Sequence, residues 1–186
     1  FFTGYLKAGK QRMEDGIIYM ELSIPNLEIK TVYRNSIVTW FDEKIRKMDR
    51  SLLIKALEEG DCRTAETFIS RQLMEGISYN DYAESYYHGF LTGLLLNAGA
   101  YRVCSNREAG TGRADLILTE QKFRGKAMVL ELKVAEKIGD MEKKCEEALA
   151  QIEEKQYMQP LKEEGFNPVL KYGICFFKKG CAVQKA

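Results

Sequence analysis

The pattern of hydrophobic and polar positions changes near residue 100 of the chain. Before that point, two short apolar runs at residues 1–7 and 16–24, with turn residues between them, predict a small hairpin. Amphipathic stretches with helical spacing follow the hairpin and predict several helices. These helical stretches cover residues 25–45, 51–59, 63–76 and 81–97, the last with Asp81 as its N-cap.

Beyond residue 100, β-rich runs dominate and are interrupted by one amphipathic helix. The predicted strands cover residues 101–108, 113–119, 126–135, 169–177 and 181–184, and the predicted helix covers residues 141–158. A helix, three strands, a second helix and two strands in this order predict an α/β layer arrangement with mixed strand directions. We therefore divide the chain into an N-terminal hairpin-and-helix extension over residues 1–60 and an α/β domain over residues 61–186.

Composition narrows the class of protein. Hydrophobic residues make up 45% and charged residues 30% of the chain, which is typical of a soluble globular protein. No run approaches the roughly 18 apolar residues of a membrane span, so we expect a cytoplasmic protein without a membrane partner. The net charge of +1 excludes a strongly basic coat for nucleic acid but permits a local basic channel. The five cysteines form no CxxC pair, which argues against a structural zinc site and favours reduced, buried thiols.

Residues 4–10 match most of the phosphate-binding loop GxxxxGK[ST]. The position after Lys10 is Gln11, which lacks the hydroxyl that holds Mg²⁺ in that loop. The motif also needs a buried strand before it and a helix after it, whereas only three residues precede it here. We interpret the segment as a turn and not as a nucleotide site.

Two predicted strands carry acidic residues that a hairpin would bring together. Side chains alternate between faces along a strand, so Glu131 and Lys133 share one face. A hairpin centred near Phe123 places Asp115 opposite Glu131, with Cβ atoms roughly 5 Å apart. Such a pair repels unless a divalent cation binds between the carboxylates, and hard oxygen ligands suit Mg²⁺ or Mn²⁺. The alternative is a register shifted by one residue, in which Glu131 and Lys133 form a surface ion pair worth about 0–1 kcal/mol.

A third acid, Glu84, lies in the last predicted helix before the strands. Helical spacing puts Glu84 on one face with Tyr87, His88 and Leu91. This face is largely aromatic and apolar, which predicts that it packs inward. Taken alone, Glu84 is better explained as a carboxylate at the helix edge that bonds to His88 or caps nothing. Beside the two strand acids it becomes the candidate third ligand of a cation.

In their order and spacing, these residues resemble the PD-(D/E)XK nuclease superfamily, and more narrowly the nuclease-like domain at the C-terminus of bacterial AAA-ATPase-like proteins. The phrases that carry the resemblance are Tyr87-His88-Gly89-Phe90-Leu91, Ser105-Asn106-Arg107-Glu108, Gly112-Arg113-Ala114-Asp115, Glu131-Leu132-Lys133, Gln151-Ile152-Glu153-Glu154-Lys155 and Lys171-Tyr172-Gly173-Ile174. Ala114 stands where the superfamily's name has Pro. The resemblance covers about residues 80–185. Residues 2–6 and 24–26 look like the tail of the ATPase-like region, which indicates a fragment of a longer protein.

The resemblance implies a restriction-endonuclease-like core, in which helices flank a mixed central sheet, with a mainly helical N-terminal extension. It also implies a metal-dependent nuclease that hydrolyses phosphodiester bonds, with DNA as the expected substrate and the ATPase-like region of the same full-length chain as a partner. Asp115 and Glu131 would hold Mg²⁺ or Mn²⁺, with Glu84 as a further ligand. Lys133 would orient the attacking water or help to deprotonate it. The remaining implied contacts to water or phosphate are Gln151, Arg107, Arg113 and Lys155.

A catalytically silent module of the same fold, which binds nucleic acid or a protein and is attached to an ATPase, is the alternative function. The near-neutral net charge favours this alternative, because a nuclease that acts alone needs a basic channel for its substrate. The presence of Glu84, Asp115, Glu131 and Lys133 together favours catalysis.

Overall fold

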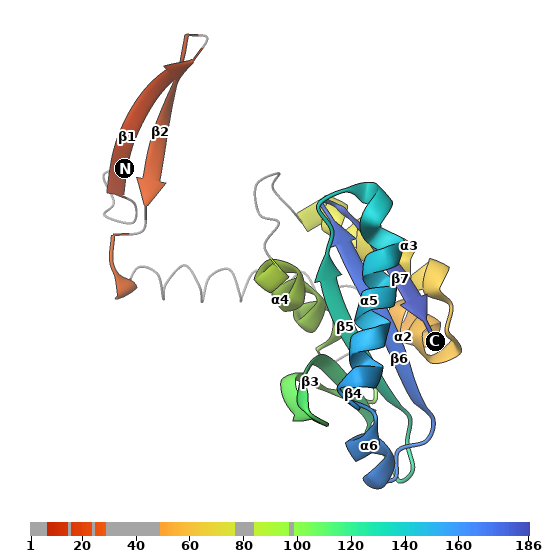
Figure 1. Ribbon diagram of the computed structural model, residues 1–186. Coiled ribbons are helices and arrows are strands. Elements are labelled where there is room, and N and C mark those ends of the chain that lie inside the picture. The colour runs from red at the N-terminus through yellow and green to blue at the C-terminus, as the bar shows by residue number, and fades with distance from the viewer. Residues whose placement is uncertain (1–6, 15, 24, 29–48, 77–83, 97–98) are drawn as a thin grey trace. The chain divides into compact units, whose positions relative to one another are not determined.

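A computed structural model describes residues 7–14, 16–23, 25–28, 49–76, 84–96 and 99–186 of the chain (Figure 1). The chain separates into two compact units, Phe1–Met48 and Asp49–Ala186. Most of the helix predicted over residues 25–45 lies outside the described residues, as do Asp81 and residues 4–6 of the loop-like motif.

The first unit contains an antiparallel strand pair, β1 (Lys7–Glu14) and β2 (Ile17–Ser23). The predicted hairpin is therefore present, but β1 occupies residues that the prediction assigned to the turn. The apolar pattern could not locate β1, because an alternating pattern of apolar residues arises only where one face of a strand is buried. The large apolar residue of β1, Met13, is 71% exposed. The turn is made at Gly16, whose φ of +78° favours glycine.

The second unit is built on a five-stranded mixed sheet in the order β3-β4-β5-β6-β7. The strands are β3 (Tyr101–Ala109), β4 (Gly112–Glu120), β5 (Ala127–Val134), β6 (Val169–Phe177) and β7 (Gly180–Lys185). β5 and β6 run parallel, and the other neighbouring strands run antiparallel. The five strands and their mixed directions confirm the sequence prediction.

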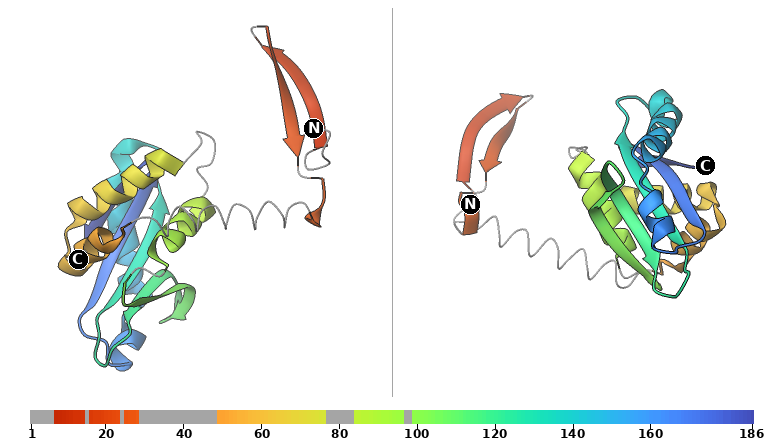
Figure 2. Two further views of the ribbon diagram at one scale, coloured as in Figure 1. Left: turned by 180° about the vertical axis from the view of Figure 1, so that it is seen from behind. Right: turned by 60° about the horizontal axis from the view of Figure 1, so that its bottom comes forward.

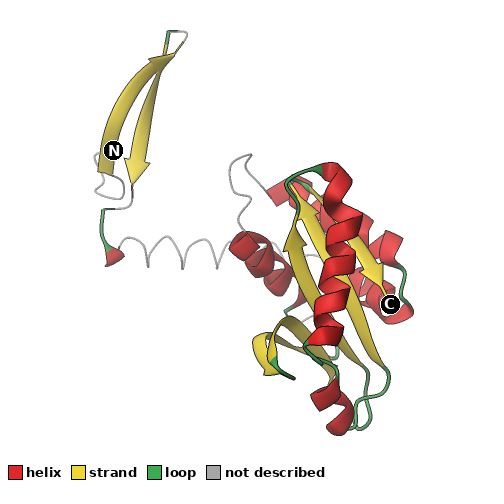
Figure 3. Cartoon of the chain, viewed as in Figure 1, coloured by secondary structure: helices red, strands yellow, loops and turns green. Residues whose placement is uncertain are grey.

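Helices cover both faces of this sheet. They are α2 (Ser51–Glu59), α3 (Cys62–Gly76), α4 (Glu84–Leu95), the 3-10 turn η1 (Ile138–Asp140), α5 (Met141–Glu154) and α6 (Gln159–Glu163). Figures 1 and 2 show α5 on one face and α2 with α3 on the other, and Figure 3 shows the same layers by type of element. α4 lies on the side of α2, because Tyr87 stacks on Phe176 with ring centroids 4.6 Å apart, while Tyr172 on the same face of β6 donates to the carbonyl of Leu57.

The structure differs from the sequence pattern in the end of one helix and in the unit to which another helix belongs. The helix predicted over residues 141–158 ends at Glu154, because the chain bends at Gln156, which has a φ of +56°. α2, which the sequence pattern placed in the N-terminal extension, lies in the second unit and packs against α3. The sheet and the helices on its two faces together form a restriction-endonuclease-like core.

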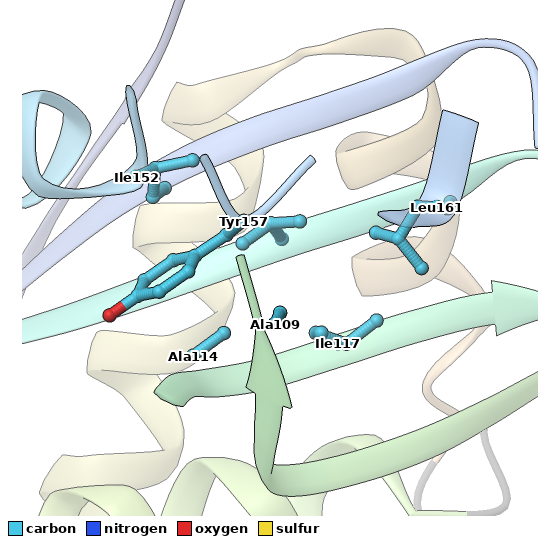
Figure 4. Packing of buried hydrophobic residues seen from close by; sticks show 8 residues of the cluster. Ala109, Ala114, Ile117, Ile152, Tyr157 and Leu161 are labelled. Atoms are coloured by element: carbon cyan, nitrogen blue, oxygen red, sulfur yellow. The ribbon is translucent and has the colours of Figure 1, made fainter. Parts of the chain in front are cut away.

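The strands at the centre of the sheet are buried on both faces, which explains why their sequences are nearly continuously apolar. A hydrophobic cluster fills the space between the end of α5 and the turn that joins β3 to β4 (Figure 4). Its labelled members are Ala109, Ala114, Ile117, Ile152, Tyr157 and Leu161. All five cysteines are free, as predicted, and three of them are buried in this unit.

Gly173 of β6 allows α5 to lie close to the sheet. A Cβ atom at this position would lie 2.2 Å from the carbonyl oxygen of Cys145 in α5. We expect Gly173→Ala to lower the free energy of unfolding by about 2–3 kcal/mol, because the helix must move away. Urea denaturation measures this change as a lower midpoint.

Gly89→Ala is the matched control for this substitution. A Cβ atom at Gly89 of α4 meets nothing within 4 Å. Because alanine has the better helix propensity, Gly89→Ala should raise the free energy of unfolding by up to about 1 kcal/mol. Equal changes in the two variants would contradict the close approach of α5 to Gly173.

Candidate active site

Strands β4 and β5 bring two acidic side chains together. The antiparallel pairing of β4 and β5 runs from Thr119 with Ala127 to Leu116 with Leu130, so the next residues along the two strands are Asp115 and Glu131. The amide of Asp115 donates to Glu131 Oε2 at 3.5 Å, and the amide of Leu132 donates to Asp115 Oδ2 at 2.9 Å. The predicted hairpin register is thus confirmed, and the alternative register shifted by one residue is wrong.

Glu131 lies in an environment that opposes its ionisation. The residue is 2% exposed, so it is not part of a surface ion pair. Burial, followed by the negative charge of Asp115, raises the pKa of Glu131 from 4.5 to about 7. The ammonium of Lys133 opposes this rise, with Nζ 3.5 Å from Glu131 Oε1. The site therefore holds more negative charge than its own lysine neutralises.

Helix α5 adds Gln151 to the same cluster. Lys133 Nζ donates to Gln151 Oε1 at 2.7 Å, and Gln151 Nε2 donates to Glu131 Oε1. The amide of Gln151 thus bridges the amine and the carboxylate. The contacts with Gln151 and Glu131 hold the ammonium of Lys133 in a fixed position. Because the side chain of Lys133 is still 26% exposed, the ammonium remains reachable from solvent.

Glu84, the third predicted acid, lies in the first turn of α4 and is exposed. His88, one turn further along this helix, reaches the site: its Nε2 lies 3.1 Å from the carbonyl oxygen of Asp115 and 3.3 Å from Ser105 Oγ. Within the described ranges, no hydrogen bond or ion pair joins Glu84 to Asp115 or Glu131. Nor does the described part of the chain hold three or more His, Cys, Asp or Glu side chains grouped for a metal ion. A ligand role for Glu84 stays a prediction.

The chemistry of the two strand acids nevertheless fits one hard divalent cation. Asp115 and Glu131 present carboxylate oxygens side by side, and their repulsion is what raises the pKa of Glu131 beyond the effect of burial. Mg²⁺ and Mn²⁺ bind through one or two carboxylates and fill the rest of their shells with water and substrate oxygens. A cation between these side chains would relieve the repulsion.

The three basic residues proposed for phosphate contact occupy different surroundings. Arg107 is ion-paired, with Nη2 2.5 Å from Glu164 Oε1. Arg113 is more exposed, and its nearest acid is Glu108 at 3.8 Å. The side chain of Lys155 is exposed, while its carbonyl accepts the amide of Thr111 at 2.9 Å. Of the three, only Arg113 lies on the strand that carries Asp115.

The sequence analysis did not identify two residues that contribute to the site. Tyr157 is buried, donates its hydroxyl to the carbonyl of Arg113 at 3.0 Å, and accepts Gln151 Nε2 at 3.4 Å. His88 was noted only as a neighbour of Glu84, yet it contacts the backbone of Asp115. Both contacts join segments far apart in the chain, and a single sequence carries no signal for them.

Glu131 should make the stability of the metal-free protein depend on pH. Its pKa is about 7 in the folded state and 4.5 without the fold, so its favourable contribution is complete below pH 4.5 and is lost as the pH rises through about 7. The shift corresponds to roughly 3 kcal/mol of unfolding free energy. Glu131→Gln should remove this dependence, measured as the difference between wild-type and variant melting temperatures in EDTA from about pH 4 to pH 8. Parallel curves for the two proteins would contradict the assignment.

A comparison with protein families identifies the family of this chain. The family model of the PD-(D/E)XK nuclease superfamily matches residues 82–186, which is more than half of the chain. The match runs from α4 to β7 and includes every acid and amine of the site. Among curated proteins no match is found. None of the helices in the described part of the chain has the length and apolar character needed to cross a membrane.

Proposed function

This chain belongs to the PD-(D/E)XK nuclease superfamily, and from that premise we propose that it is a metal-dependent nuclease that hydrolyses phosphodiester bonds in DNA. The observation that carries the proposal is the contact of Asp115 with Glu131 between strands β4 and β5, with Lys133 beside Glu131. A buried carboxylate with a raised pKa, as Glu131 has beside Asp115, is costly to the fold and is typical of functional sites. DNA as the substrate rests on the family resemblance.

In the proposed reaction, Asp115 and Glu131 hold Mg²⁺ or Mn²⁺, helped by the backbone carbonyl of Leu132. Glu84 contributes from α4, either directly or through a water. When bound, such a cation lowers the pKa of its water and neutralises charge that develops on the phosphate. The protein's part is to hold the carboxylate oxygens in place before substrate arrives, which the amide of Leu132 does for Asp115.

Lys133 acts on the attacking water and on the phosphate. Its ammonium is fixed between Gln151 Oε1 and Glu131 Oε1, so no reorganisation is needed when charge develops on the phosphate oxygens. From this position it orients the water and assists the removal of its proton. Gln151 has two proposed tasks, to hold Lys133 and to steer a water or a backbone phosphate.

Arg113, Arg107 and Lys155 are the proposed contacts to the nucleic-acid backbone. Arg113 is the most direct candidate, because it is exposed and lies two residues before Asp115 on β4. Arg107 must exchange its Glu164 partner for a phosphate. The net charge of only +1 gives the chain no strongly basic coat, and we propose that the ATPase-like region of the full-length protein supplies further contacts.

A second candidate function is a binding module of the same fold without turnover. The near-neutral charge and the position of Glu84, with no bond to the other acids in the described ranges, favour it. The two functions differ in the fate of the bound substrate. A nuclease converts the substrate, whereas the module retains it unchanged.

Incubation of supercoiled plasmid, single-stranded DNA and single-stranded RNA with the protein tests this proposal. We expect cleavage of DNA with Mg²⁺ or Mn²⁺, none in EDTA, and recovery when the cation is restored in excess. Tight DNA binding without cleavage under all these conditions would favour the binding module. Cleavage of RNA alone would support the proposed phosphodiester hydrolysis but contradict DNA as the substrate.

A further inference from the structure

We propose that Tyr157 is a positioning residue for Lys133, and that it acts through Gln151. This inference rests on the proposed nuclease function and deepens it. Among the described residues, no hydrogen bond joins Tyr157 to Asp115 or Glu131. Its hydroxyl lies between the carbonyl of Arg113 and the amide of Gln151, at 3.0 Å and 3.4 Å respectively.

The ring of Tyr157 is held firmly, so its hydroxyl has a defined place. The residue is 2% exposed and belongs to the hydrophobic cluster with Ala114 and Ile152 shown in Figure 4. Gly112 makes room for it, because a Cβ atom there would lie 3.1 Å from the Tyr157 hydroxyl oxygen. The bend that carries Tyr157 is tied to the β3–β4 turn by the bond from the amide of Thr111 to the carbonyl of Lys155.

The donor and acceptor roles of Arg113, Tyr157, Gln151 and Glu131 allow one arrangement of their hydrogen bonds. The carbonyl of Arg113 can only accept, so the Tyr157 hydroxyl donates its proton there and keeps its oxygen as an acceptor. That oxygen then takes one N–H of Gln151, and the Glu131 carboxylate takes the other.

With both N–H groups of Gln151 engaged, its Oε1 is left to face an ammonium. Lys133 Nζ lies 2.7 Å from this oxygen. If the Gln151 amide were turned over, it would present N–H groups to Lys133 and an oxygen to the Glu131 carboxylate, and both contacts would be repulsive. The Tyr157 hydroxyl adds to this preference, because a turned-over amide would place the Gln151 oxygen against the hydroxyl oxygen, which already donates its proton to Arg113.

Tyr157→Phe tests this inference, because it keeps the ring in the cluster and removes only the hydroxyl. We expect the single-turnover rate constant for DNA cleavage to fall about tenfold, while the dissociation constants for DNA and for Mn²⁺ change less than about twofold. Tyr172→Phe is the matched control, since Tyr172 is also buried and donates its hydroxyl to the carbonyl of Leu57 at the α2 face of the sheet. Its cleavage rate should stay at the wild-type value although it also loses one buried hydrogen bond.

A double-mutant cycle separates positioning from a loss of stability. If Tyr157 acts through Gln151, Tyr157→Phe has no further effect on the rate in a Gln151→Ala background. Losses that multiply would overturn the inference, as would a Tyr157→Phe rate equal to that of Tyr172→Phe.

A readout without catalysis keeps this inference distinct from the proposed function. The side-chain amide resonances of Gln151 in ¹H–¹⁵N spectra should shift in Tyr157→Phe and stay unchanged in Tyr172→Phe. Unchanged resonances in both variants would overturn the positioning role. If Tyr157→Phe shifts these resonances but the wild-type protein cleaves nothing, the nuclease function is overturned and the contact between Tyr157 and Gln151 stands.

Discussion

Lys133→Met should lower the rate of cation-dependent DNA cleavage by about a thousandfold and leave the substrate bound. Methionine keeps much of the length and volume of lysine but removes the ammonium that lies 3.5 Å from Glu131 and 2.7 Å from Gln151. The loss should fall on the single-turnover rate constant, because the charge acts on the transition state and not on DNA affinity. The assay belongs at about pH 8.5, since the Lys133 charge helps to keep Glu131 ionised and its removal raises the pKa of that carboxyl further.

Lys137→Met is the matched control for this variant. Lys137 is exposed in the segment after β5, four residues beyond Lys133, and has no proposed part in the reaction. Its cleavage rate should equal that of the wild type. If Lys133→Met cleaved as fast as the wild type, or if both variants lost activity alike, the role of the Lys133 ammonium would be refuted.

Asp115→Asn should lower the affinity for Mn²⁺ about a hundredfold or more, and cleavage should be lost with it. The variant removes one of two carboxylates, whereas its side-chain oxygen can still accept the amide of Leu132 that anchors the residue. In EDTA it should be at least as stable as the wild type, because the repulsion of Glu131 disappears. Calorimetric titration with Mn²⁺ and melting curves in EDTA measure the two effects.

Asp140→Asn controls for the loss of one negative charge. Asp140 is exposed at the end of η1, so its substitution should change neither the Mn²⁺ affinity nor the melting temperature appreciably. Undiminished Mn²⁺ binding by Asp115→Asn would mean that the cation binds elsewhere. A strongly destabilised Asp115→Asn protein in EDTA would mean that the carboxylate serves the fold and not a ligand.

The sheet could be predicted because its strands are short, apolar and separated by clear turn residues. The acid pair could be predicted for the same reason: a symmetrical hairpin about Phe123 fixes which residues face each other, and Asp115 and Glu131 are equally far from its centre. β1 could not be located, since a strand with exposed side chains has no apolar alternation. The end of α5 was also missed, because Gln156 adopts a positive φ that no composition signal marks.

The parts of the site that were not predicted are those that depend on contacts between layers. Tyr157 meets Arg113 across 44 positions of sequence, and His88 meets Asp115 across 27. Arg107 is ion-paired with Glu164, a partner 57 positions away that the sequence did not indicate, and its phosphate contact stays a prediction. In each case the partner depends on how the helices pack on the sheet, and a local pattern of residue types does not predict that packing.

Diffraction from a Mn²⁺-soaked crystal, recorded near the manganese absorption edge, tests most directly whether the paired carboxylates are a cation site. We expect an anomalous peak within about 2.5 Å of oxygen atoms from both Asp115 and Glu131, and no peak there in crystals of Asp115→Asn. A map with no peak between these carboxylates, or with manganese bound only at other acids, would contradict the proposed site.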